Sequence, residues 1–266
     1  MCLHGLRGNH LNWMRAASGL SRLGRVLVPD FAGHGLTPRA GRSSGVPTSR
    51  ALLSDFIGKV AGGGPVVLCG NSLGGSIALL QAGAEPKTVL GVAAVGAALP
   101  PARGRRPPPA VLAGTVLYAL PVVGSALGWL RIRAISAEKL VALGFRVVTG
   151  DASRVPKDVM RRHIEMTRLQ QADPDAVAAF VQTSRSIVAM MPRPDIAHRY
   201  LDAITCPVLI MHGGKDRIIP LEPTLAATRP GWDVRVFPEL GHVIQLEAPG
   251  PFLSTIEDWL HSVSLL

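Results

Sequence analysis

Three residues of the chain are of the types that acyl-transfer chemistry needs. Ser72 lies between Gly70 and Gly74, in the G-x-S-x-G spacing of a nucleophile elbow, where a strand turns sharply into a helix. A serine hydroxyl is a weak nucleophile at neutral pH, so it needs a histidine to take its proton and a carboxylate to orient that histidine. Asp216 and His242 each follow a predicted strand. We predict that Ser72, Asp216 and His242 form a catalytic triad.

Acyl transfer also needs two backbone N–H groups that stabilise the charge developing on the carbonyl oxygen. Leu73 directly follows Ser72 at the start of a predicted helix, where the first N–H groups have no partner within the helix. Leu6 lies in the segment His4-Gly5-Leu6-Arg7-Gly8, just ahead of the first helical pattern. We predict Leu6 and Leu73 as the two donors of an oxyanion hole.

Other acids and histidines are weaker candidates for the triad. His34 lies in a Gly-His-Gly turn, and Asp30 ends a predicted strand, so both are expected to be structural. Three further acids lie in the central part of the chain, at its end or within the last predicted strand: Asp195, Asp202 and Asp233.

Alternating strand-like and helix-like segments at both ends of the chain must position these residues. Short apolar runs predict strands at 25–30, 65–70, 89–97, 207–212 and 232–237. Helical patterns are found at 11–23, 48–60, 73–84, 222–228 and 250–262. Continuous apolar strands separated by helices indicate a mostly parallel, doubly wound sheet with both faces covered.

The middle of the chain has no strand pattern. A proline-rich, basic stretch at 100–109 is followed by helix-compatible sequence, with the clearest helices at 158–170 and 175–188. We therefore predict a core in two parts, 1–98 and 204–266, and a helical insertion at 99–203.

Residues 110–130 form a run of 21 residues without a charge, which is long enough to cross a bilayer. A single crossing would place the two halves of one sheet on opposite sides of the membrane, and Pro121 interrupts the run. We expect a broken helical hairpin that either packs over the core or dips into a membrane surface. In the second case arginines that flank it would meet lipid phosphates; these are Arg103, Arg105, Arg106, Arg131 and Arg133.

Composition limits the other classes of function. The 266-residue chain has a formal net charge of +10, but its basic residues are not interleaved with stacking aromatic residues, so nucleic-acid binding is not expected. Cys2, Cys69 and Cys206 are odd in number and lack metal-site spacing, which indicates neither a disulfide framework nor a metal site. No secretion signal is recognisable. We expect a cytoplasmic protein, membrane-associated if 110–130 docks on lipid.

Five segments together resemble the signature motifs of α/β-hydrolase fold proteins. The resemblance covers 1–98 and 204–266, and the insertion takes the position of that family's variable helical cap. It implies Ser72 as nucleophile, His242 as base, Asp216 as orienting acid, the two predicted oxyanion donors, and no cofactor. The family usually has two further strands and most of a third before the first motif, so we expect either a sheet with truncated N-terminal strands or a misassigned start with residues missing upstream. The segments are 4–8, 29–37, 70–75, 212–220 and 241–242.

A serine at the elbow argues against the epoxide hydrolase and haloalkane dehalogenase branches, whose nucleophile is aspartate. We expect a serine hydrolase, of the esterase or lipase kind, that cleaves a carboxylic ester of a hydrophobic acyl substrate. Thioesters, lactones and carbon–carbon bonds remain open as substrates. Two alternatives also remain: a cofactor-free perhydrolase or haloperoxidase that uses the same triad, and a non-catalytic binding module.

Overall fold

The computed structural model describes residues 1–103, 134–190 and 194–266. In the described residues, five strands form one sheet, and every neighbouring pair is parallel. Their order in space is the same as their order in the chain, β1-β2-β3-β4-β5. The strands are β1 (Cys2–Leu3), β2 (Val66–Asn71), β3 (Val89–Val95), β4 (Val208–Gly213) and β5 (Asp233–Phe237).

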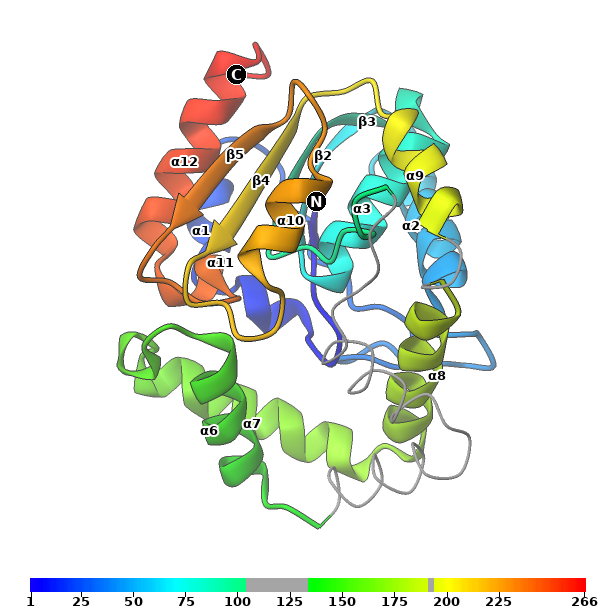
Figure 1. Ribbon diagram of the computed structural model, residues 1–266. Helices are drawn as coiled ribbons and strands as arrows, with labels where there is room; N and C mark the ends of the chain where they lie inside the picture. Colours follow the sequence, from blue (N-terminus) through cyan, green and yellow to red (C-terminus); the bar gives the residue numbers. More distant parts are fainter. Residues whose placement is uncertain (104–133, 191–193) are drawn as a thin grey trace.

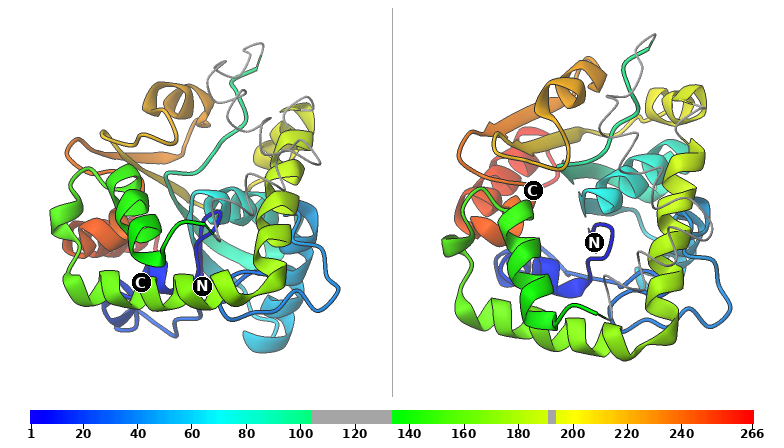
Figure 2. Two further views of the ribbon diagram at one scale, coloured as in Figure 1. Left: turned by 90° about the horizontal axis from the view of Figure 1, so that it is seen from below. Right: turned by 60° about the horizontal axis from the view of Figure 1, so that its bottom comes forward.

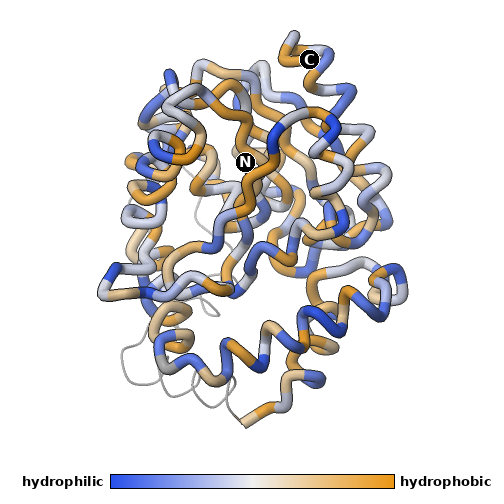
Figure 3. Tube along the Cα trace, turned by 180° about the vertical axis from the view of Figure 1, so that it is seen from behind, coloured by the Kyte–Doolittle hydropathy of each residue, from blue (hydrophilic) through white to orange (hydrophobic). Residues whose placement is uncertain are grey.

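Both faces of the sheet are apolar, because successive side chains of a strand point to opposite sides. Val208 and Ile210 of β4 pack into one buried cluster, whereas Leu209 and Met211 pack into the other. Hydrophobic segments are concentrated in the middle of the molecule, and hydrophilic ones lie mostly toward its outside (Figure 3). This is the pattern of a parallel sheet that is covered twice.

Two sets of helices cover these faces (Figure 1). One cluster includes residues from α2 (Val46–Val60) and α3 (Leu73–Ala84). The other includes residues from four elements on the opposite face: η1 (His10–Trp13), α1 (Ala17–Leu20), α11 (Ile244–Glu247) and α12 (Pro249–Ser262). The short connections η2 (Pro86–Thr88) and α10 (Leu221–Ala227) lead into β3 and β5. The fold is therefore a mostly parallel, doubly wound α/β sheet, as the sequence predicts.

Further helices lie between β3 and β4 in the chain, and three of them form a layer beyond one end of the sheet (Figures 1 and 2). That layer consists of α6, α7 and α8, whereas α9 packs on α3. A Cβ at Gly83 would lie 2.6 Å from the carbonyl carbon of Tyr200. The elements are α6 (Ala137–Val148), η3 (Ala152–Arg154), α7 (Lys157–Ala172), α8 (Pro174–Met190) and α9 (Pro194–Asp202).

Some local predictions were wrong. Residues 25–30 are not a strand. The neighbouring β1 is only two residues long. The hydrogen bond from Cys2 N–H to Leu27 O (2.8 Å) does not by itself form a β-ladder. The helix predicted at 11–23 is instead split between η1 and α1.

The apolar run 110–130 lies outside the described residues. Over 1–103, 134–190 and 194–266, no helix combines the length and the apolar character that a membrane crossing requires. The predicted boundaries of the insertion, 99 and 203, stay a prediction.

Candidate active site

The residue at the elbow has strained backbone geometry. Ser72 follows β2 directly and precedes α3, with φ +54° and ψ −118°, a region that residues with a Cβ rarely occupy. A Cβ at Gly70 would lie 2.5 Å from the Cα of Gly75, so the tight turn requires glycine there. The N–H of Ser72 donates to Val95 O (2.8 Å) on β3, which fixes the elbow to the next strand.

The segment that carries Leu6 lies beside this serine. A Cβ at Gly5 would lie 3.1 Å from the Cβ of Ser72, and a Cβ at Gly74 would lie 2.6 Å from the carbonyl carbon of Leu3. The start of α3 is therefore pressed against β1 and the loop that follows it. Both predicted oxyanion donors belong to backbone within this contact region.

Asp216 and His242 are in direct contact. Nδ1 of His242 lies 2.7 Å from Oδ2 of Asp216, and the two side chains are 5% and 0% exposed. The carboxylate can only accept, so Nδ1 carries the proton and Nε2 is the nitrogen left for a substrate or a hydroxyl. Asp216 follows β4, and His242 follows β5. Both therefore lie at the carboxyl edge of the sheet, where Ser72 also lies.

The carboxylate of Asp216 is held in its charged form. Burial alone would raise its pKa, but the hydrogen bond and the charge of His242 outweigh that cost. The N–H groups of Ile219 and Ile218 add to this by donating to Oδ1 at 2.9 and 2.8 Å. The pKa of Asp216 consequently lies below its ordinary value, and the acid stays ionised opposite an imidazolium.

Asn71 connects the elbow to the histidine. Its buried side-chain amide donates to His242 O (2.9 Å) and to Val95 O (3.1 Å). The residue before the predicted nucleophile thus holds the backbone of the predicted base. Gly96, just after β3, leaves the room in which the acid and the base meet: a Cβ there would lie 2.9 Å from Nδ1 of His242 and 3.2 Å from Oδ2 of Asp216.

Three of the remaining candidates have structural partners elsewhere. Asp30 accepts from the N–H groups of His10 (2.6 Å) and Leu36 (2.9 Å), as a turn residue does. His34 is buried, and Nδ1 donates to Ala32 O at 3.3 Å. Asp202 forms ion pairs with Arg229 and Arg103. The acid that contacts His242 is Asp216.

Comparison with known proteins agrees with this architecture. The model of the alpha/beta hydrolase family matches residues 1–255. The chain belongs to the alpha/beta hydrolase family.

Relatives of this alpha/beta hydrolase include enzymes of several kinds. The chain is 25% identical to the dihydrolipoyllysine-residue acetyltransferase component of an acetoin cleaving system from Pseudomonas putida; the match covers 92% of this chain and 59% of that protein. It is 28% identical to a 2-hydroxy-6-oxo-2,4-heptadienoate hydrolase from Pseudomonas putida, over 94% of this chain and 83% of that one. A thermophilic esterase from Thermogutta terrifontis has the same fold, with a TM-score of 0.70, 21% identity and coverage of 98% and 89%.

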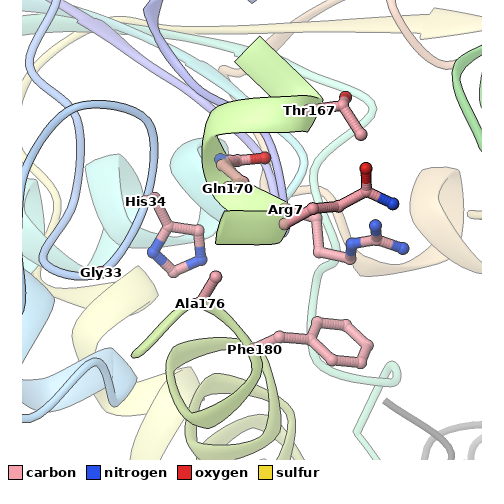
Figure 4. A pocket seen from close by; sticks show the side chains of 8 residues that line it. Arg7, Gly33, His34, Thr167, Gln170, Ala176 and Phe180 are labelled. Carbon is pink, nitrogen blue, oxygen red and sulfur yellow. The ribbon is translucent and has the colours of Figure 1, made fainter. Parts of the chain in front are cut away.

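The hydrolase has a small hollow next to the loop of the predicted oxyanion donor. Arg7, the residue after Leu6, lines it from the core, while Gln170 and Phe180 line it from the helical layer (Figure 4). The guanidinium carbon of Arg7 lies 5.5 Å from the centre of the Phe180 ring. Most of the side chains in this lining are polar: Arg7, His34, Thr167, Gln170 and Gln171.

Two polar residues that support the site are not among the site residues predicted from the sequence. Asn71 holds the backbone of His242, and Glu247 accepts from the N–H of Gly241 (2.8 Å), the residue before the histidine. For Glu247, the signal in the sequence is a charged residue within an apolar segment. In the described ranges no cluster of three or more His, Cys, Asp or Glu residues is suited to hold a metal ion.

Proposed function

We propose that this alpha/beta hydrolase cleaves a carboxylic ester of a hydrophobic acyl substrate through an acyl-enzyme on Ser72. The observation that carries the proposal is the 2.7 Å hydrogen bond between His242 and Asp216, at the sheet edge where the strained elbow presents Ser72. An imidazole that a carboxylate orients next to a serine can act as the general base that activates the serine hydroxyl.

In the first half of the reaction, Oγ of Ser72 attacks the ester carbonyl carbon while Nε2 of His242 takes the hydroxyl proton. The charge on the carbonyl oxygen is stabilised by the N–H groups of Leu6 and Leu73. The tetrahedral intermediate then collapses, and the imidazolium gives its proton to the leaving alkoxide. An alcohol departs, and the acyl group remains on the serine.

In the second half, water replaces the alcohol. Nε2 of His242 takes a proton from the water as its oxygen attacks the acyl carbon, and the proton is then returned to Oγ of Ser72 as the acid is released. Asp216 keeps its negative charge throughout and stabilises the imidazolium in both halves. The depressed pKa of Asp216 supports this role.

The hydrophobic acyl group is supported by the composition and by the uncharged run at 110–130, which lies outside the described residues. The proposal leaves two places for that run: packed over the core, or docked on a membrane surface.

A second candidate reaction is hydrolysis of a carbon–carbon bond. It is favoured by the relative named a 2-hydroxy-6-oxo-2,4-heptadienoate hydrolase, which is 28% identical over 94% of this chain. The same acid, base and serine would be required, so the two candidates differ in substrate and not in the residues that act.

A fluorophosphonate probe and a series of p-nitrophenyl esters of increasing acyl length test the proposal. We expect the wild type to be labelled and to hydrolyse the esters, and Ser72→Ala to lose both properties. Ser76→Ala is the matched control, because that serine lies one turn further on α3 and its hydroxyl donates to Ala98 O (2.8 Å). Equal labelling of wild type and Ser72→Ala would disprove the proposal. Turnover of a 2-hydroxy-6-oxodienoate without ester turnover would favour the second candidate, and activity only with peroxide and halide would favour a perhydrolase.

A further inference from the structure

The carboxylate of Glu247 is buried behind the histidine loop. Its side chain is 0% exposed, and it belongs to the short helix α11 that begins two residues after His242. A buried charge is costly unless hydrogen bonds satisfy it. Here the two oxygens accept hydrogen bonds from four donors, so each carboxylate oxygen has two partners.

These donors come from two different parts of the molecule. Oε2 accepts from the N–H groups of Gly241 (2.8 Å) and Gly150 (2.9 Å). Oε1 accepts from the N–H of Asp151 (3.0 Å) and from Nη1 of Arg154 (3.2 Å). Gly241 is the neighbour of His242 in the chain, whereas the other three donors follow α6 in the helical layer. The one carboxylate therefore bridges the base-bearing loop and that layer.

Backbone contacts at the same place reinforce this bridge. The N–H of His242 donates to Val148 O at 2.7 Å, and the N–H of Val243 donates to the same oxygen at 3.2 Å. A Cβ at Gly241 would lie 2.5 Å from the nitrogen of Gly150, so the two segments touch backbone to backbone. The position of His242 thus depends on residues 148–151.

Arg15 fixes the helix that carries the carboxylate. Its Nη1 donates to Leu246 O (2.6 Å), Glu247 O (3.0 Å) and Arg154 O (3.1 Å). Arg15 therefore fixes the end of the helix on which Glu247 lies. The carboxylate of Glu247 in turn holds the loops on either side of it.

We propose that Glu247 is a positioning residue, which sets the place of His242 by tying its loop to segment 148–151 of the helical layer. The inference rests on the proposed function, because it assigns His242 the role of base. The carboxylate does not touch the substrate; it acts through the backbone of Gly241.

Glu247→Gln is a sharp test of this role. Each carboxylate oxygen faces two donors, so the NH2 group of glutamine would oppose two donors in either orientation. The loop must then shift, and displacements of about 1 Å at a catalytic group cost up to about 100-fold in rate. We expect kcat for a short p-nitrophenyl ester, per fluorophosphonate-titrated site, to fall by about 10- to 100-fold, with KM within about 3-fold of the wild type.

Glu239→Gln is the matched control. Glu239 lies two residues before Gly241, its side chain is 67% exposed, and it pairs with Lys215. We expect wild-type kcat from it. If Glu247→Gln does not fold, Glu247→Asp, which keeps the charge on a shorter side chain, carries the test with the same expected split between kcat and KM. A folded variant with wild-type kcat per titrated site, or with a change in KM alone, would overturn the inference.

One readout does not depend on turnover. The proton on Nδ1 of His242, in its hydrogen bond to Asp216, is expected to give a downfield proton resonance in the wild type and in Glu239→Gln. In Glu247→Gln the resonance should shift or broaden, and an unchanged resonance would contradict the positioning role. Failure of the proposed function would be recognised separately, as wild-type protein that neither is labelled nor turns over esters.

Discussion

Gly96→Ala is expected to damage the site through one methyl group. Gly96 has φ +53°, and a Cβ there would lie 2.9 Å from Nδ1 of His242 and 3.2 Å from Oδ2 of Asp216. Non-bonded heavy atoms prefer separations of about 3.5 to 4 Å, so the imidazole must move by about 0.6 Å. That movement would stretch the 2.7 Å hydrogen bond between His242 and Asp216 by at most the same amount, to about 3.3 Å, the outer limit of a good N–H···O contact.

We expect kcat for a short p-nitrophenyl ester to fall by about 10- to 100-fold. The variant also places a Cβ in the left-handed region, which costs about 1 to 2 kcal/mol of stability. Gly62→Ala separates the two effects: Gly62 has φ +71°, but nothing lies within 4 Å of its Cβ position. Urea unfolding should show a loss of stability in both variants, larger in Gly96→Ala because its Cβ is also crowded, whereas steady-state kinetics should show the loss of kcat in Gly96→Ala alone. If the kcat values of the two variants agree within about 2-fold, the reasoning about the acid–base contact is wrong.

Two further predictions concern buried polar groups. Burial, followed by the charge of His34, lowers the pKa of His4 from 6.5 to about 3. Below pH 6.5 the unfolded chain therefore binds a proton at His4 that the native state does not bind. The free energy of unfolding should consequently fall by up to about 1.4 kcal/mol per pH unit. Urea titrations between pH 7 and 4 should show a shallower fall in His4→Gln, and identical slopes would refute the assignment. Asn71→Ala removes the amide that donates to His242 O at 2.9 Å. The variant should lose about 1 to 3 kcal/mol of stability, and its kcat should fall. Gln81→Ala, which removes another buried amide of two hydrogen bonds, should lose stability alone; loss of kcat in both would refute a specific tether.

The fold was predictable because its signal is local. Continuous apolar runs at 65–70 and 207–212 correspond to β2 and β4, since a strand buried on both faces needs apolar residues at every position. The predicted strand at 25–30 failed for a reason that its own sequence does not contain: its neighbour β1 has only two residues. Ladder formation depends on the partner strand as well as on the strand itself.

The site was predictable to the extent that motifs mark it. The sequence placed Asp216 and His242 after neighbouring strands, and the structure brings them to 2.7 Å; the roles of these residues and of Ser72 stay predictions until the variants are measured. Asn71 could not be found, because its partner His242 lies 171 positions away in the chain. Glu247 stands out only as a charge within apolar sequence, and its link to Gly150, 97 positions away, is not visible in the sequence. Only folded coordinates reveal which backbone groups a buried carboxylate or amide meets.

The attachment of the helical layer limits how the protein can open. Segment 148–151 is bonded to the loop of His242. In α8, Oγ1 of Thr183 donates to Ser44 O (2.7 Å) and Oγ of Ser186 accepts from the N–H of Val46 (2.9 Å). The layer is thus fastened to the core at two separate places. A movement of the whole layer would pull the loop of His242 with it and separate the imidazole from its carboxylate. Passage of reactant and product would therefore depend on local movement within the layer.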